Sequence, residues 1–129
     1  MIVLCTDQCD FSKPLADGRW KGSKEFVAAL SGWSRICPNL YIWDYSANFQ
    51  YLPMAFECVH VMPANFRLFK KEGAIGVFEE GHHVGSRGAD AQLKLWVLAH
   101  LAWEPDQPLE PLRKPGVLQA TGSQRVRHD

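Results

Sequence analysis

Residues 40–49 read Leu-Tyr-Ile-Trp-Asp-Tyr-Ser-Ala-Asn-Phe, and this stretch decides how the rest of the chain is interpreted. Its first four residues are aliphatic or aromatic, which is typical of a buried strand. Asp44, Tyr45, Ser46 and Asn48 follow at the point where such a strand leaves its sheet. In open parallel sheets and in α/β barrels, functional groups gather at this carboxyl end of the strands. The stretch therefore predicts a strand and a site together.

Two further apolar runs, at residues 2–5 and 74–78, predict strands of the same kind. Helical patterns alternate with them: residues 23–36, a helix that begins at Pro63, and a last helix that begins near Asp90. The order strand–helix–strand–helix–strand–helix predicts an α/β fold with parallel strands. The handedness of such crossovers places the helices on one face of the sheet.

Three βα units are too few for a complete (β/α)8 barrel, which needs about 250 residues. The 129 residues therefore predict a partial, TIM-barrel-like arrangement of about three units. Three parallel strands covered on one face leave the other face and both edges bare. We therefore expect the chain to be part of something larger, or to self-associate through its exposed sheet edges.

The pattern of the chain changes near residue 105. Prolines follow one another at short intervals, at positions 105, 108, 111 and 115, and residues 119–129 have no apolar period. Such a sequence has too few apolar groups to order itself. We expect one domain over residues 1–108 and a disordered tail over residues 109–129.

Composition excludes several classes of function. The 14 basic and 14 acidic residues cancel, which argues against a nucleic-acid binder that depends on a basic surface. Cys5 and Cys9 lack zinc-site spacing, and we expect no metal and no cofactor. No apolar run is long enough for a membrane span and no signal peptide is visible, so we expect no membrane partner and, for this chain alone, the cytosol.

Five motifs occur in a fixed order: CDFSKPL at residues 9–15, LYIWDY at 40–45, PANFRLF at 63–69, GVFE at 76–79 and LAWEPD at 101–106. Together they resemble the bacterial domain family DUF4838, over about residues 1–108. The resemblance implies the last units of a glycoside-hydrolase-type (β/α)8 barrel, akin to α-glucuronidases. It implies an architecture and a sugar-related role without a settled reaction, and an exported parent protein in many bacteria.

The chain departs from this family at two places. Glu80 stands where the family usually has Gln, and His82 and His83 follow it. Residues 116–129 resemble a translated mammalian interspersed repeat instead. A truncated or chimaeric gene model is therefore one origin that we consider for this reading frame.

Asp44 and Glu79 are the candidate catalytic residues. Each comes at the end of a predicted strand, so both should lie on one rim of a parallel sheet. Glycoside hydrolysis uses two carboxyl groups, of which one donates a proton and the other acts as nucleophile or base. The alternative is that both carboxyls only orient neighbours or bind loop amides.

The candidate substrate-binding residues surround this pair: Tyr45, Asn48, Asp10, Glu80 and His82. Aromatic rings and polar side chains bind sugars by stacking and by hydrogen bonds. Asp10 has the alternative of capping a turn, and Trp43, inside the strand, is interpreted as core. A metal site at Glu79, His82 and His83 is not adopted, because no metal motif supports it.

We therefore expect a fragment of a carbohydrate-active, glycoside-hydrolase-like barrel protein that is inactive alone. The first alternative is a non-enzymatic carbohydrate-binding or assembly module. The second is a truncated gene-model product without function. In the first two cases the expected partner is a carbohydrate.

Overall fold

The computed structural model describes residues 1–49, 57–81 and 91–113. Its strands are β1 (Ile2–Cys5), β2 (Leu40–Tyr45) and β3 (Gly76–Glu80). Its helices are α1 (Lys21–Ser34), α2 (Met62–Lys71), α3 (Ala91–Trp103) and α4 (Leu109–Leu112), with a 3₁₀ turn, η1, at Leu15–Asp17. Among these described residues, no helix has the length and apolarity needed to cross a membrane.

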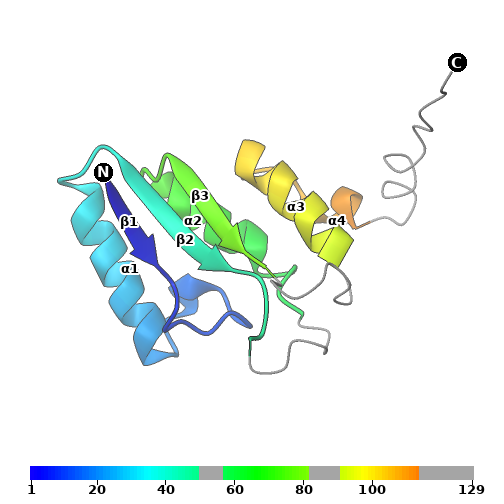
Figure 1. Cartoon of the computed structure of the whole chain (residues 1–129), viewed down its shortest axis with the longest axis horizontal. Coiled ribbons are helices and arrows are strands. Elements are labelled where there is room, and N and C mark those ends of the chain that lie inside the picture. The colour runs from blue at the N-terminus through cyan, green and yellow to red at the C-terminus, as the bar shows by residue number, and fades with distance from the viewer. Residues whose placement is uncertain (50–56, 82–90, 114–129) are drawn as a thin grey trace, which may run out of the picture.

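The three strands form an open, parallel sheet in the order β1-β2-β3 (Figure 1). The alternation of strands and helices predicted from the sequence is confirmed. Gly73, just after α2, has a φ of 76°, a left-handed conformation that favours glycine at the end of a helix. That turn directs the chain from α2 into β3.

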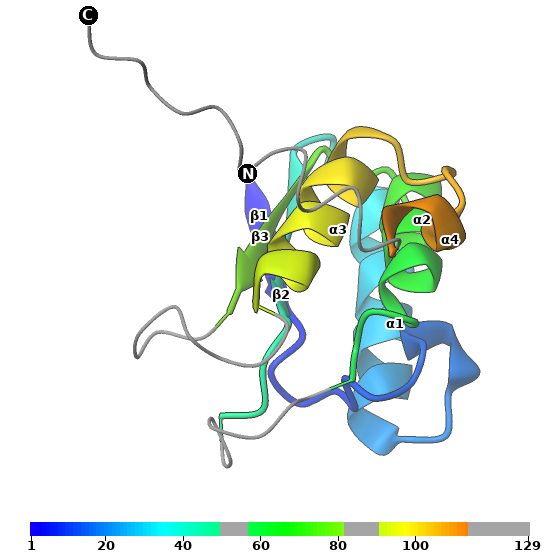
Figure 2. The same ribbon diagram turned by 90° about the vertical axis from the view of Figure 1, so that its right-hand side faces the viewer.

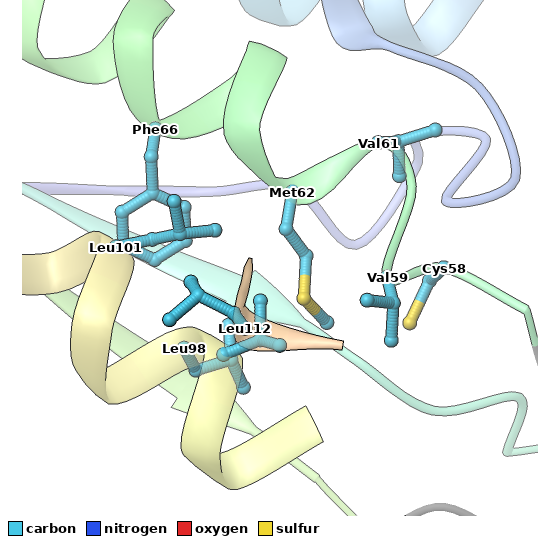
Figure 3. Close-up of a cluster of buried hydrophobic side chains, with 9 residues drawn as sticks. Cys58, Val59, Val61, Met62, Phe66, Leu98, Leu101 and Leu112 are labelled. Carbon is cyan, nitrogen blue, oxygen red and sulfur yellow. The ribbon is translucent and has the colours of Figure 1, made fainter. Parts of the chain in front are cut away.

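Helices α1 and α2 lie on one side of the sheet, as the view in Figure 2 shows, and α3 packs against α2. The face of the sheet that they cover buries Leu40 and Ile42 against Leu30 of α1 and Phe69 of α2. A second apolar cluster joins α2 to α3 and α4, and it includes Met62, Phe66, Leu98, Leu101 and Leu112 (Figure 3). Burial of these side chains supplies the main favourable term for folding.

The other face of the sheet is open in the described structure. Val3, Trp43 and Phe78 are exposed there, and the rings of Trp43 and Phe78 pack edge to face at 5.0 Å. The interpretation of Trp43 as core is therefore wrong, because its side chain is 38% exposed. Successive side chains of a strand point to opposite faces, and Trp43 lies between Ile42 and Asp44, which both point to the helices.

The C-terminal part differs from the expectation of disorder from residue 109. Residues 109–112 form α4, and Leu112 is only 6% exposed because it packs into the cluster with α2 and α3. Leu109 and Leu112 supply apolar side chains for this packing, which the closely spaced prolines gave no reason to expect. Residues 114–129, which include the whole repeat-like stretch, lie outside the described residues.

Candidate functional site

Asp44 and Glu79 stand side by side, as the sequence predicts. Strands β2 and β3 pair in parallel with Asp44 opposite Glu79 and Tyr45 opposite Glu80. Because side chains alternate along a strand, these two pairs point to opposite faces of the sheet. Asp44 lies on the helix-covered face and is 5% exposed, and Glu79 beside it is half-buried with its Oε1 atom inside; we call the two the interior pair.

Both carboxyl groups have a raised pKa because they are buried beside each other. Burial raises the pKa of Asp44, while hydrogen bonds from Thr6 and the Tyr45 backbone act in the opposite direction. The Thr6 hydroxyl donates to Asp44 Oδ1 at 2.6 Å. Burial, the charge of Asp44 and the hydrogen bond with Asp44 raise the pKa of Glu79 to about 9. At neutral pH a proton therefore resides on Glu79, which has fewer donors around it.

A buried lysine, absent from the sequence-based candidates, lies in the same interior layer. Lys94 of α3 is 4% exposed, and its Nζ donates to the carbonyl oxygen of Ser46 at 3.1 Å. The same carbonyl accepts from the Cys58 thiol at 3.5 Å. Burial raises the pKa of that thiol to about 11, and the charge of Lys94 partly opposes the shift. A lysine within an apolar helix was the signal that could have identified this position.

A cavity of about 330 Å³ adjoins this lysine, and its lining includes Ser46, Gly81 and Gln92. The cavity lies at the carboxyl edge of the sheet, between the end of β2 and the first turns of α3. The buried Lys94 and Ser46 therefore border a cavity at the sheet edge where the sequence predicts the site.

Tyr45 and Glu80 point to the open face at the same edge. The Trp43 indole N–H donates to Glu80 Oε2 at 2.9 Å, and the Tyr45 hydroxyl lies 3.4 Å from the Cys5 sulfur. The contact with Cys5, more than burial or nearby charges, raises the pKa of Tyr45 to about 12. The phenol is therefore neutral at physiological pH and remains able to donate a hydrogen bond.

A surface hollow of about 340 Å³ lies where β1 and β2 end. We call it the rim hollow, and its lining is Asp7, Cys9, Asp10, Phe11, Ala47, Asn48 and Phe49. The ring of Tyr45 lies 5.5 Å from that of Phe11 and 5.6 Å from that of Phe49, so three aromatic rings gather beside it. Polar side chains and aromatic faces therefore meet in one concave surface.

Asp10 caps a turn and also borders the rim hollow. Its Oδ1 accepts hydrogen bonds from the Ser12 backbone N–H at 2.9 Å and from the Ser12 hydroxyl at 2.6 Å, so it caps a turn as the alternative interpretation predicts. It also lines the rim hollow together with Asn48. Phe11, which the sequence did not single out, adds an aromatic wall.

The predicted site residues therefore divide into two groups. Asp44 and Glu79 form the interior pair, whereas Asp10, Tyr45, Asn48 and Glu80 lie at the rim. His82 lies outside the described residues, as does His83. Within residues 1–49, 57–81 and 91–113, no three His, Cys, Asp or Glu side chains are grouped in a way that could hold a metal ion.

Comparison with known proteins identifies the family but no individual relative. No curated protein and no solved structure matches the chain. The model of a domain of unknown function, DUF4838, matches residues 1–116, which includes α4 as well as the three βα units. The chain therefore belongs to the DUF4838 family.

Proposed function

We propose that this chain binds carbohydrate at the rim hollow, as part of a glycoside-hydrolase-like barrel. The observation on which the proposal rests is the composition of that hollow. Three aromatic rings, those of Phe11, Tyr45 and Phe49, gather beside the side chains of Asp10 and Asn48 at the carboxyl edge of a parallel sheet. Sugar rings present apolar C–H faces and polar hydroxyl edges, and this surface offers partners for both.

The architecture supports the barrel part of the proposal. Adjacent parallel strands in sequential order, with helices on one face, are the repeating pattern of an α/β barrel. In a barrel, the face without helices is the packed interior. The exposed Val3, Trp43 and Phe78 would then meet side chains of further strands, which removes their contact with water.

The open edges of β1 and β3 support the same proposal. Both strands present unpaired backbone groups along one side of the described sheet, and such edges are sites for further pairing. Further βα units or a second copy of the chain would satisfy them. Because a barrel site collects residues from several strands, we propose that the chain alone is catalytically inactive.

Hydrolysis by Asp44 and Glu79 stays a prediction. A carboxyl group that is protonated at neutral pH, as Glu79 is, suits the role of general acid. The burial of Asp44 opposes direct contact with a substrate. The reaction therefore requires access to the pair from the carboxyl edge, where the cavity beside Lys94 lies.

Titration of the full chain with neutral oligosaccharides, followed by tyrosine and tryptophan fluorescence or by NMR, tests the proposal. Phe11→Ala removes one ring from the rim hollow, and we expect binding to weaken by about five-fold, since one aromatic contact contributes about 1 kcal/mol. Trp103→Ala is the matched control, because Trp103 is 91% exposed and lies at the end of α3. Equal loss in both variants, or no binding of any glycan, would contradict the proposal.

Turnover assays separate an enzyme from a binding module. Loss of turnover with retained binding in Glu79→Gln and Asp44→Asn would support an enzyme. Binding without turnover in the unmodified chain would support a non-enzymatic module. Absence of both activities would favour a product without function.

A further inference from the structure

We propose that the sugar bound in the rim hollow has no acidic group, and that a protonated amino group on the sugar strengthens its binding. This inference rests on the proposed function and specifies its ligand class. Among residues 1–49, 57–81 and 91–113, the charged side chains that line the rim hollow are two carboxylates, Asp7 and Asp10. A uronic acid or a sulfated sugar would therefore meet charges of its own sign.

The two carboxylates are held in position by neutral groups. Asp7 Oδ2 accepts a hydrogen bond from the Gln8 side-chain amide at 3.0 Å. Asp10 Oδ1 accepts from the backbone N–H and the hydroxyl of Ser12. Gln8 and Ser12 are both uncharged, so these hydrogen bonds orient the carboxylates without cancelling their charges.

Basic side chains on the neighbouring segments lie elsewhere. Arg19 is 3.8 Å from Asp17, and Lys21 is 3.6 Å from Glu25. Lys94 is directed into the interior, toward the carbonyl of Ser46. Lys13 and Lys24 are exposed, and neither lines the rim hollow. An anionic sugar would therefore find no cation in the described wall of the hollow.

Two titratable groups beside the rim hollow have raised pKa values, to which the charge of Asp7 makes a smaller contribution. The pKa of Cys9 rises to about 12, first through burial and then through the charges of Asp44 and Asp7. The pKa of Tyr45 rises through its contact with Cys5 and through burial, with additional contributions from the charges of Glu80 and Asp7.

The test compares three trisaccharides of matched length: a glucosamine trimer, a glucose trimer and a galacturonic acid trimer. Calorimetry on the full chain at low salt and pH 6 keeps the amine protonated and the uronate ionised. We expect the glucosamine trimer to bind about three- to ten-fold more tightly than the glucose trimer, because exposed charge pairs contribute modestly. The galacturonic acid trimer should bind least, and high salt should shrink these differences.

Asp7→Asn and Asp10→Asn should bring the affinities for the three trimers together. Asparagine keeps the Oδ1 acceptor for Ser12, and Asp7 is exposed, so both variants should fold; circular dichroism checks this. Asp106→Asn is the control, since it removes one charge from a residue that does not line the rim hollow and that pairs with Lys70.

Each outcome has a distinct meaning. Equal or tighter binding of the galacturonic acid trimer would overturn this inference and leave sugar binding intact. An equal effect of Asp106→Asn would also overturn it, because the preference would then come from net charge. If no trimer binds, the proposed function fails, and the inference fails with it.

Discussion

Replacing Glu79 with glutamine should remove a pH dependence from the stability of this protein. In the unfolded chain Glu79 has an ordinary pKa of 4.5, and in the folded chain its pKa is about 9. Folding therefore takes up a proton between these two pH values. Because the folded state binds more protons, the free energy of unfolding falls as pH rises through this window, by up to about 1.4 kcal/mol per pH unit.

The magnitude follows from that window. From pH 4.5 to pH 7, the uptake of one proton by Glu79 costs about 3 kcal/mol, which is a large part of the stability of a small domain. Glutamine has nearly the same shape, stays neutral, and its amide can donate to Asp44 as the protonated carboxyl does. We therefore expect Glu79→Gln to be more stable than the unmodified protein by about 2–3 kcal/mol at pH 7. The two proteins should be equally stable near pH 4.5.

Urea unfolding followed by tryptophan fluorescence, at pH values from 4.5 to 8.5, measures both free energies. Glu110→Gln is the matched control, because Glu110 is exposed in α4 and its replacement should leave the pH slope unchanged. Parallel pH profiles for Glu79→Gln and the unmodified protein would refute the reasoning. So would a Glu79→Gln protein that is less stable at pH 8.

Two further perturbations test the packing around the site. Gly22→Ala should destabilise the protein by about 1–3 kcal/mol, because a Cβ there would lie 1.9 Å from the carbonyl oxygen of Gln8. Gly32→Ala, in the same helix with nothing within 4 Å, should instead stabilise it by about 0.5–1 kcal/mol. Thermal unfolding compares the stabilities of the two variants. Equal destabilisation by both would contradict a specific clash with Gln8 at position 22. Thr6→Val should cost about 1–3 kcal/mol because Asp44 loses a buried donor, whereas Thr6→Ser keeps the hydroxyl. If urea unfolding showed the Thr6→Val variant to be more stable than the Thr6→Ser variant, the result would argue against this hydrogen bond.

Part of the candidate site was predictable from local sequence. Asp44 and Glu79 each end a short apolar run, and parallel strands bring such ends to one edge. Their neighbourhood could therefore be predicted without coordinates. The face to which they point could not, because alternation along a strand separates two faces but does not say which one the helices cover.

The same reason explains the error at Trp43. A tryptophan within an apolar run is usually buried, and the run gives no sign that one face lacks a cover. Lys94 and Phe11 were not identified for a related reason. Their roles depend on contacts with Ser46 and Tyr45, which are distant in sequence.

The sequence by itself determined the order of strands and helices, the parallel sheet and the family, because these follow from apolar periodicity, turn residues and short motifs along the chain. Only the tertiary structure decided that Asp44 and Glu79 are an interior pair and that the rim hollow lies beside Tyr45. It also showed that α4 packs against the helices. Those features arise from packing between distant segments, where burial sets the charge of a carboxyl group and the shape of a surface.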